Sequence, residues 1–297
     1  MDKGLKGKGT GTVIQAEHLS KVYIIKEKKH IFGKKEERRI SAVKDISLEI
    51  PKGKITGVLG INGAGKTTTI RMLASLITPT SGRLTVDGVD GIKKHIWVKE
   101  RINMISGGER NLYWRLTAEE NLRYFGSLYG IRKKELEIRI KKLLETVGLQ
   151  EAAKIPVERY SKGMKQRLQI ARGLINEPEY LFLDEPTLGL DILIAKEIRK
   201  LILELAREQQ KGILLTTHYI GEAEELCDYI YVLDQGQIIA KGTKEELKEI
   251  FKVKPRMVIQ EMSLEEVLMK ILKKARGEND AEYHVDNEGG DHKTTTV

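Results

Sequence analysis

A glycine-rich stretch near residue 60 carries the residue types that bind phosphate. Residues 55–69, ITGVLGINGAGKTTT, contain G-x-x-x-x-G-K-[ST] from Gly60 to Thr67. In this pattern the glycines let successive backbone N–H groups point at a phosphate, the lysine reaches the β- and γ-phosphates, and the threonine hydroxyl ligates Mg²⁺. The residues expected to bind the nucleotide are Gly60, Asn62, Gly63, Ala64, Gly65, Lys66, Thr67 and Thr68.

The elements around this stretch favour a nucleotide site over a glycine turn that carries a surface lysine. An apolar, β-branched run at residues 55–59 predicts a strand before the glycines. Residues 70–77 have a helix-like pattern after them. The turn would then lie at a helix N-terminus, whose partial positive charge favours an anion.

Acidic residues follow a second apolar run. Residues 180–183 read as a buried parallel strand that ends in Asp184 and Glu185. At the end of such a strand beside a phosphate loop, Asp184 is expected to bind Mg²⁺ through water rather than to cap a helix. His218 follows the strand predicted at residues 212–217, from which it can reach the γ-phosphate. In isolation such a histidine is more often structural.

A second possible anion site begins the amphipathic helix predicted at residues 161–175. Ser161 is a good N-cap, and Met164, Leu168 and Ala171 lie on one face of the helix. The first amides of this helix could therefore bind an anion as well. One ATP needs only one such site, so the second has no evident use within the same chain.

The composition describes a core-forming protein with an uneven positive charge. The 297 residues are 40% hydrophobic and 32% charged, with a net charge of +9 concentrated in residues 3–8, 26–39 and 252–274. These segments are read as solvated faces, with anionic lipid next and nucleic acid as a further alternative. The one cysteine, Cys227, excludes an intramolecular disulfide and suits a reducing cytoplasm. No apolar run is long enough to span a bilayer, so we expect the chain not to cross a membrane.

The remaining segments suggest an α/β core with additions. Residues 1–12 read as a flexible tail, and residues 26–39 as a solvated loop between the strands of a hairpin. Residues 117–147 contain two amphipathic helices with no strand between them, the first opened by a T-x-x-E capping box, which suggests a helical insertion. The tail at residues 252–297 predicts an amphipathic helix followed by disorder.

Taken in order, these motifs resemble the ATP-binding subunit of an ATP-binding cassette (ABC) transporter over residues 13–251. GINGAGKT resembles Walker A, and YSKGMKQR at residues 160–167 stands where that family has its signature LSGGQxQR. LFLDEP resembles Walker B, LGLD at residues 188–191 resembles the D-loop, and TTHY carries the switch histidine. The implied fold is the ABC type of P-loop NTPase: a parallel core sheet with an antiparallel β subdomain and a helical insertion at about residues 111–175.

The resemblance implies roles for several residues. Tyr23 would stack on adenine, Glu185 would accept a proton from the attacking water, and His218 would contact the γ-phosphate. Ser161 and Gly163 would close on the γ-phosphate held by a partner's Walker A, in a homodimer or a paired ABC dimer that holds two ATP molecules. The chain would act with ATP and Mg²⁺ at the cytoplasmic face of the membrane, bound to an integral membrane permease, and no nucleic acid is expected.

Two positions depart from the family pattern. Lys162 replaces a glycine of the signature. The glutamine of the Q-loop falls at Gly108, and no glutamine occurs between Gln15 and Gln150. Glu109 is the nearest polar substitute. It would either take over part of the sensing of Mg²⁺ and phosphate or point to solvent.

The alternative to a transporter subunit is a soluble ATPase of the same superfamily, acting in translation or DNA maintenance. Such translation factors carry two cassettes, and the chromosome type inserts a long coiled coil between Walker A and the signature; this chain has one cassette and only 95 positions from Lys66 to Ser161. A cassette without catalysis is disfavoured because Lys66, Asp184, Glu185 and His218 are all present. The segment SLEEVLMK near the C-terminus resembles the final helix of exporter ATPases, so export is preferred over import.

Overall fold

The computed structural model describes residues 13–28, 35–106 and 112–250. The tails predicted at residues 1–12 and 252–297, and the departure at Gly108 and Glu109, lie outside these residues and stay predictions. The α-helices are α1 (Lys66–Leu73), α2 (His95–Arg101), α3 (Ala118–Leu128), α4 (Lys133–Thr146), α5 (Lys162–Leu174), α6 (Ile192–Arg207), α7 (Ile220–Leu226) and α8 (Lys244–Ile250), with a 3₁₀ turn at Val157–Arg159.

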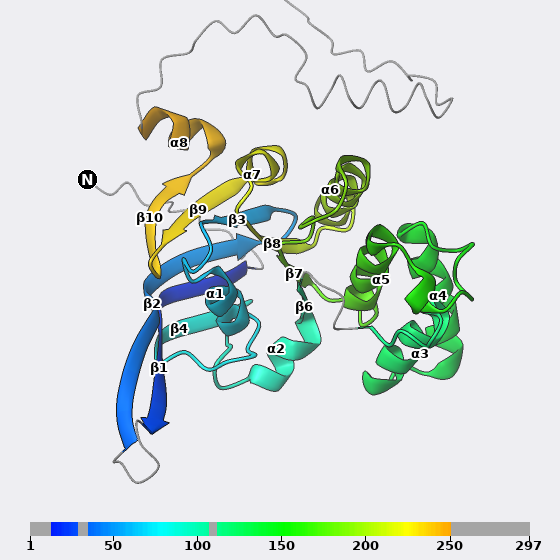
Figure 1. The fold of residues 1–297 in the computed structure, drawn as a ribbon, viewed down its shortest axis with the longest axis horizontal. Coiled ribbons are helices and arrows are strands. Elements are labelled where there is room, and N and C mark those ends of the chain that lie inside the picture. Colours follow the sequence, from blue (N-terminus) through cyan, green and yellow to red (C-terminus); the bar gives the residue numbers. More distant parts are fainter. Residues whose placement is uncertain (1–12, 29–34, 107–111, 251–297) are drawn as a thin grey trace, which may run out of the picture. The chain divides into compact units, whose positions relative to one another are not determined.

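The strands form one mixed sheet of ten members (Figure 1). They are β1 (Val13–Lys28), β2 (Lys35–Pro51), β3 (Ile55–Leu59), β4 (Ser81–Val86), β5 (Val89–Asp90), β6 (Ile102–Ser106), β7 (Tyr180–Asp184), β8 (Gly212–Thr217), β9 (Tyr229–Asp234) and β10 (Gln237–Gly242). Their order is β5-β4-β1-β2-β10-β9-β3-β8-β7-β6. The strands from β9 to β6 in this order are parallel, whereas β1, β2, β4 and β5 pair antiparallel, so the predicted α/β class with an antiparallel β part is confirmed.

The register of the parallel strands brings their carboxyl ends together. Asp184 pairs with Thr216, and Thr217 pairs with Leu59 at the start of the glycine loop. Parallel strands present the residues that follow them at the same edge of the sheet. Walker A, the two acids of Walker B and His218 therefore meet at one edge.

The parallel strands bury both of their faces. Leu181 and Leu183 pack in a cluster with α5, α6 and the helices of the insertion, whereas Phe182 and Tyr180 belong to a second cluster with α1 and the antiparallel strands. A strand whose side chains are buried on both sides reads as a continuous apolar run. This is the pattern from which β7 was predicted.

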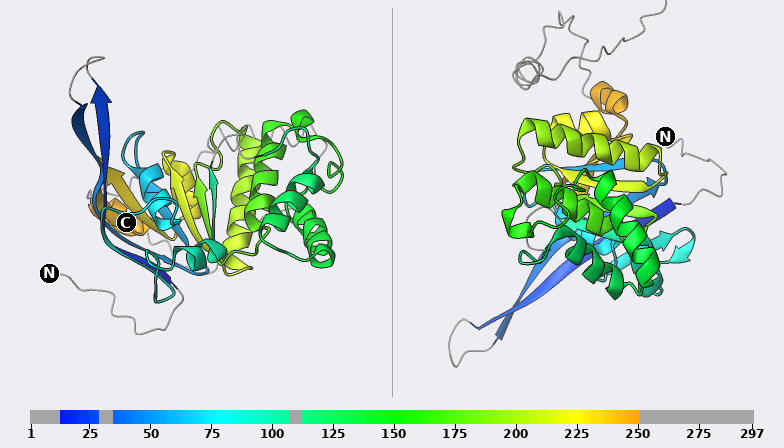
Figure 2. Two further views of the ribbon diagram at one scale, coloured as in Figure 1. Left: turned by 90° about the horizontal axis from the view of Figure 1, so that it is seen from below. Right: turned by 90° about the vertical axis from the view of Figure 1, so that its right-hand side faces the viewer.

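The helices α3, α4 and α5 lie together beside β6 at the edge of the sheet (Figures 1 and 2). Helix α3 begins with the predicted capping box: the Thr117 hydroxyl accepts from the Glu120 amide at 3.2 Å, and the Glu120 carboxylate accepts from the Thr117 amide at 2.8 Å. No helix among the described residues is both long and apolar enough to cross a bilayer.

Two parts of the sheet differ from the sequence prediction. The solvated loop predicted at residues 26–39 is wrong in extent, because β1 continues to Lys28 and β2 begins at Lys35, with cross-strand pairs from Tyr23↔Ile40 to Lys28↔Lys35. Charged side chains allow a strand when both of its faces meet solvent, because the backbone ladder needs no apolar side chain. The short edge strand β6, with α2 before it, was not predicted.

Candidate active site

The phosphate loop has the backbone that its glycines predict. Gly63 and Gly65 have φ values of +85° and +104°, in the left-handed region that favours glycine. A Cβ at Gly65 would lie only 2.8 Å from the Ala42 carbonyl oxygen, so a side chain there is excluded by space as well. Gly65 is the N-cap of α1 and offers no side-chain acceptor, which leaves the first amides of the helix available to an anion.

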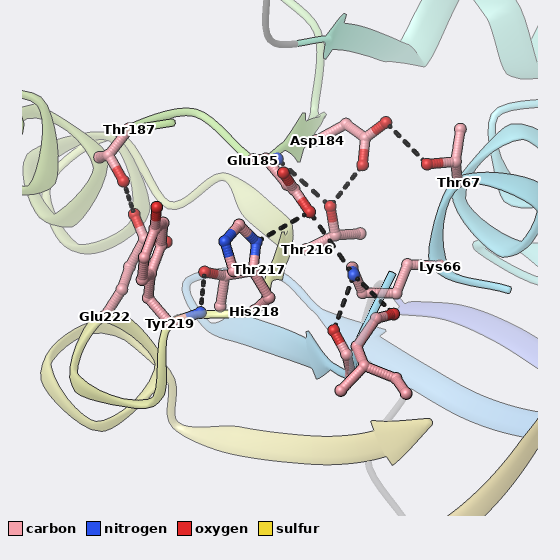
Figure 3. Close-up of polar contacts among 12 residues, drawn as sticks. Lys66, Thr67, Asp184, Glu185, Thr187, Thr216, Thr217, His218, Tyr219 and Glu222 are labelled. Atoms are coloured by element: carbon pink, nitrogen blue, oxygen red, sulfur yellow. Dashed lines mark hydrogen bonds and ion pairs between the residues drawn. The ribbon is translucent and has the colours of Figure 1, made fainter. Parts of the chain in front are cut away.

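Lys66 is held at the centre of the site. Its side chain is only 5% exposed, and Nζ donates to the carbonyl oxygens of Gly60 at 2.7 Å and Ile61 at 3.2 Å. The same Nζ lies 3.5 Å from Glu185 Oε1 (Figure 3). A buried ammonium with donors facing a loop of this kind is suited to bind phosphate oxygens.

The carboxylate of Asp184 is fixed through both of its oxygens. Thr216 Oγ1 donates to Oδ1 at 2.5 Å, and Thr67 Oγ1 lies 3.3 Å from Oδ2 (Figure 3). A hydroxyl and a carboxylate are hard oxygen donors, and Mg²⁺ in nucleotide sites takes one or two such ligands together with phosphate oxygens and water. Thr67 and Asp184 therefore fit this ion.

Glu185 has an unusual backbone conformation. Its φ is +52°, in the left-handed region, which is uncommon for a residue with a side chain. The Glu185 amide donates to the Thr216 carbonyl oxygen at 3.0 Å. This turn directs Oε1 to within 3.2 Å of His218 Nδ1 and 3.5 Å of Lys66 Nζ, so one carboxylate contacts both predicted catalytic partners (Figure 3).

These residues border a cavity of about 490 Å³. The predicted residues that line it are Asn62, Gly63, Gly65, Lys66, Thr67, Thr68 and Glu185. Its remaining lining residues, Ile40, Ser41, Ala42, Lys44 and Gln235, were not predicted. They come from β2 and the β9–β10 turn, which motif reading could not place beside the loop. Eight of the twelve lining residues have polar side chains, which suits a phosphate site.

The other predicted residues lie at or beyond the margin of this cavity. Asp184 and His218 contact lining residues directly, and Ala64 is buried behind the loop. Tyr23 does not line the cavity, although its cross-strand partner Ile40 does, and Lys21 Nζ lies 5.4 Å from the centre of the tyrosine ring. Its stacking on adenine stays a prediction.

Ser161 and Gly163 are placed at the start of α5 and do not line the cavity. Ser161 Oγ accepts from the Met164 amide at 3.2 Å, as predicted for an N-cap. Gly163 has no room for a side chain, because a Cβ there would lie 2.6 Å from Ile194 Cγ2. Lys162 extends over the D-loop: a Cβ at Gly189 would lie 2.3 Å from its Nζ.

Comparison with known proteins agrees with this geometry. Residues 43–188 match the family model described as ABC transporter. The chain is 46% identical over 210 residues to the ABC transporter ATP-binding protein NatA of Bacillus subtilis, covering 71% of this chain and 85% of the relative. It is 42% identical over 208 residues to the bacitracin transport ATP-binding protein BcrA of Bacillus licheniformis, covering 70% and 67%.

Solved structures show the same fold. One of them is an ATP-binding subunit of an ABC transporter. The superposition covers 88% of this chain and all of the solved chain, with a TM-score of 0.67 at 28% identity. A dimeric ATP-binding cassette in a post-hydrolysis state with ADP and Pi matches 77% of this chain and 98% of its own, with a TM-score of 0.66 at 25% identity.

Proposed function

Because the chain belongs to the ABC transporter ATP-binding family, we propose that its ATPase site powers transport, and specifically export, through a separate membrane permease. The observation that carries the catalytic part is the position of Glu185 Oε1, within 3.5 Å of Lys66 Nζ and 3.2 Å of His218 Nδ1. A carboxylate that can accept a proton, a cation and an imidazole therefore lie in contact beside the phosphate loop.

In the proposed reaction, water attacks the γ-phosphorus of ATP while the bond to the oxygen that bridges to the β-phosphate breaks. Glu185 accepts the proton of the water, and ADP and phosphate are the products. The Lys66 ammonium stabilises the negative charge on the phosphate oxygens, and His218 holds the Glu185 carboxylate. Mg²⁺, bound by Thr67 and Asp184, would neutralise charge on the phosphates and orient them.

The start of α5 would complete the site of a second copy. Ser161 is exposed and lies outside the cavity of its own chain, so its hydroxyl and the neighbouring amides remain accessible. A head-to-tail arrangement would place them against the γ-phosphate held by the partner. The dimeric cassette among the solved relatives supports such an arrangement.

We place the permease contact on the helical insertion, around residues 112–130. Tyr113, Trp114 and Tyr124 are each more than two-fifths exposed, and the rings of Tyr113 and Tyr124 meet edge to face at 4.8 Å. The buried Asn121 side chain holds the turn beneath them by accepting from the Tyr113 amide at 2.8 Å and donating to the Thr117 carbonyl at 2.9 Å. Clustered exposed aromatic rings on a rigid base are typical of a protein interface.

Export is supported by the names of the relatives, one of which is a bacitracin transport protein and another a linearmycin resistance protein. Association with a permease would hold the chain at the cytoplasmic face of the membrane. The transported molecule would be recognised by the permease and not by this chain.

Affinity purification of the tagged chain from detergent-solubilised membranes tests this proposal. We expect an integral membrane protein to copurify, and we expect Tyr113→Ala with Tyr124→Ala to reduce its recovery while ATP binding is retained. Exposed Ile138→Ala on α4 is the matched control and should leave recovery unchanged. Recovery with ribosomes or DNA and no membrane protein would favour the soluble alternative.

A further inference from the structure

A buried hydrogen bond joins the turn after Walker B to helix α7. Thr187 Oγ1 donates to Glu222 Oε1 at 2.7 Å (Figure 3), and the two residues are 8% and 5% exposed. The other carboxylate oxygen of Glu222, Oε2, is buried and has no hydrogen-bond partner among the described residues. Because a carboxylate is costly to bury and a buried polar atom without a partner is rare, Glu222 is expected to have a specific role.

The stability of α7 does not explain why Glu222 is buried. An acid in the first turn of a helix interacts favourably with the helix dipole, but this interaction needs no burial. Glu224 and Glu225 of the same helix are exposed. The carboxylate of Glu222 instead contacts the Thr187 hydroxyl (Figure 3). This contact distinguishes Glu222 from the other acids of α7.

The two segments that this bond joins also carry predicted catalytic residues. Glu185 lies two residues before Thr187, and His218 lies four residues before Glu222. Glu185 Oε1 is 3.2 Å from His218 Nδ1, so the segments that follow β7 and β8 meet at a second point (Figure 3). A single contact would let one segment pivot on the other, whereas two contacts fix their relative orientation.

The turn that contains Thr187 also includes a strained residue. The φ of Glu185 is +52°, and Gly189 on the other side of Thr187 has a φ of +67°. A left-handed residue with a side chain persists where the surrounding structure holds it. Within the turn, the Leu188 amide donates to the Glu185 carbonyl at 3.2 Å, and the Leu190 amide donates to the Thr187 carbonyl at 3.1 Å. The Thr187 hydroxyl adds a bond from this turn to α7.

We propose that Glu222 is a positioning residue of the ATPase site: through Thr187, it holds the turn that carries Glu185 against His218. Neither Thr187 nor Glu222 lines the nucleotide cavity, so both would act through the position of Glu185 and leave ATP binding to the phosphate loop. The inference rests on the proposed function in one respect, because it takes Glu185 as the base.

Thr187→Val tests this inference, because it removes the hydroxyl and retains the shape of the side chain. We expect turnover to fall at least ~10-fold as the base is displaced, while the KM for ATP stays within about twofold. Glu222→Met should have a similar effect, and the double variant should lose no more than the larger single loss, because both changes break one bond. Thr187→Ser and Glu222→Gln retain a donor and an acceptor and should stay within about threefold of the parent.

Tyr180→Phe is the matched control. It also removes a buried hydroxyl, which donates to Asp87 Oδ1 at 2.5 Å from the other end of β7. The control is expected to lower the thermal midpoint but to leave turnover unchanged at temperatures where every variant is folded. Equal turnover in Tyr180→Phe and Thr187→Val would overturn the inference.

The imidazole ¹⁵N signal of His218 provides a measurement that does not depend on hydrolysis. The signal is identified by its absence in His218→Ala. We expect it to move in Thr187→Val and to stay in place in Thr187→Ser and Tyr180→Phe; an unmoved signal in Thr187→Val would overturn the inference. If the parent hydrolysed no ATP while the signal moved as expected, the proposed function would fail and the positioning by Glu222 would stand.

Discussion

Helices α1 and α5 both begin with a lysine at a potential anion site, but the two N-termini are built differently. At α1 the preceding residue is Gly65, which has no side chain to cap the helix, and Lys66 is 5% exposed beside Glu185. At α5 the preceding residue is Ser161, whose hydroxyl already accepts the Met164 amide, and Lys162 is exposed.

The difference separates a helix start that faces catalytic side chains of its own chain from one that does not. The first turn of α1 lies beside two acids at the end of β7 and beside a threonine hydroxyl and an imidazole at the end of β8, all of the same chain. Neither helix has an acid within its own first turn, but the start of α5 lies outside the cavity. Similar helix starts can thus serve binding within a chain or between chains, depending on what the sheet places opposite them.

Glu185→Gln should produce the largest effect. It retains the size of the side chain and its contact with His218 but removes the proton acceptor, so we expect steady-state turnover to fall at least ~100-fold. ATP binding should change only a few-fold, and the variant should accumulate as an ATP-bound dimer. Phosphate release, equilibrium nucleotide binding and light scattering measure the three quantities. Turnover within a few-fold of the parent would contradict the assignment of Glu185 as the base.

Lys66→Ala should weaken ATP binding by roughly 10- to 100-fold, the range for losing a hydrogen bond from a charged group to phosphate. The control is Lys162→Ala, the same substitution at the first residue of α5. It should leave the affinity of the monomer for ATP unchanged. Equal losses in the two variants, measured by titration at protein concentrations below dimerisation, would remove the distinction between the two helix starts.

Ser161→Ala should lower turnover about tenfold without weakening ATP binding to the monomer, because the hydroxyl would act only across the dimer. Losing the cap also costs about 1 kcal/mol of stability, so the thermal midpoint is measured in parallel.

Mixing two inactive variants separates the loss of a contact across the dimer from the loss of stability caused by removing the helix cap. Ser161→Arg retains its own Lys66, and Lys66→Ala retains its own Ser161, so a mixed head-to-tail dimer contains one intact composite site. Activity should reappear on mixing. If the mixture stays as inactive as its components, the two helix starts do not form a shared site.

Lys162→Gly, which restores the residue of the family signature, should have the smallest effect. The Lys162 ammonium lies next to Gly189, so we expect turnover within about twofold of the parent, as for a surface substitution. The measurement is turnover as a function of salt. A change above tenfold that disappears at high salt would show that the ammonium takes part in anion binding.

The composition of the active site could be read from the sequence, but not the contacts that hold it. Asp184 and Lys66 follow from motifs in which residue type, spacing and adjacent strands agree. The hydrogen bond from Thr216 to Asp184 depends on the register between β7 and β8, and the two residues are 32 positions apart. The left-handed φ of +52° at Glu185 is not marked by a glycine, the residue that usually signals this conformation. Neither leaves a pattern in local sequence.

The hairpin shows a different limit. The charge run at residues 26–39 resembles a solvated loop because the strand residues within it, 26–28 and 35–39, are all charged, which removes the apolar–polar alternation from which strands are recognised. Only the hydrogen-bond ladder between the two strands distinguishes a charged hairpin from a solvated loop. Strand β6 was missed because Asn103 interrupts its sequence INMIS, whereas β7, of the same length, has a continuous apolar run.

The pairing of β3 has a consequence for the order in which the protein is made. Both neighbours of this strand, β8 and β9, follow it late in the chain, and Leu59 pairs with Thr217, 158 positions later. The phosphate loop would therefore leave the ribosome long before β8 or β9 has been synthesised. Until then, β3 would remain an unpaired apolar strand. Contacts so distant in sequence slow folding and expose nascent chains to aggregation. Nucleotide can stabilise this protein only after residues near 217 have been synthesised, so ATP acts on the finished cassette and not on its early intermediates.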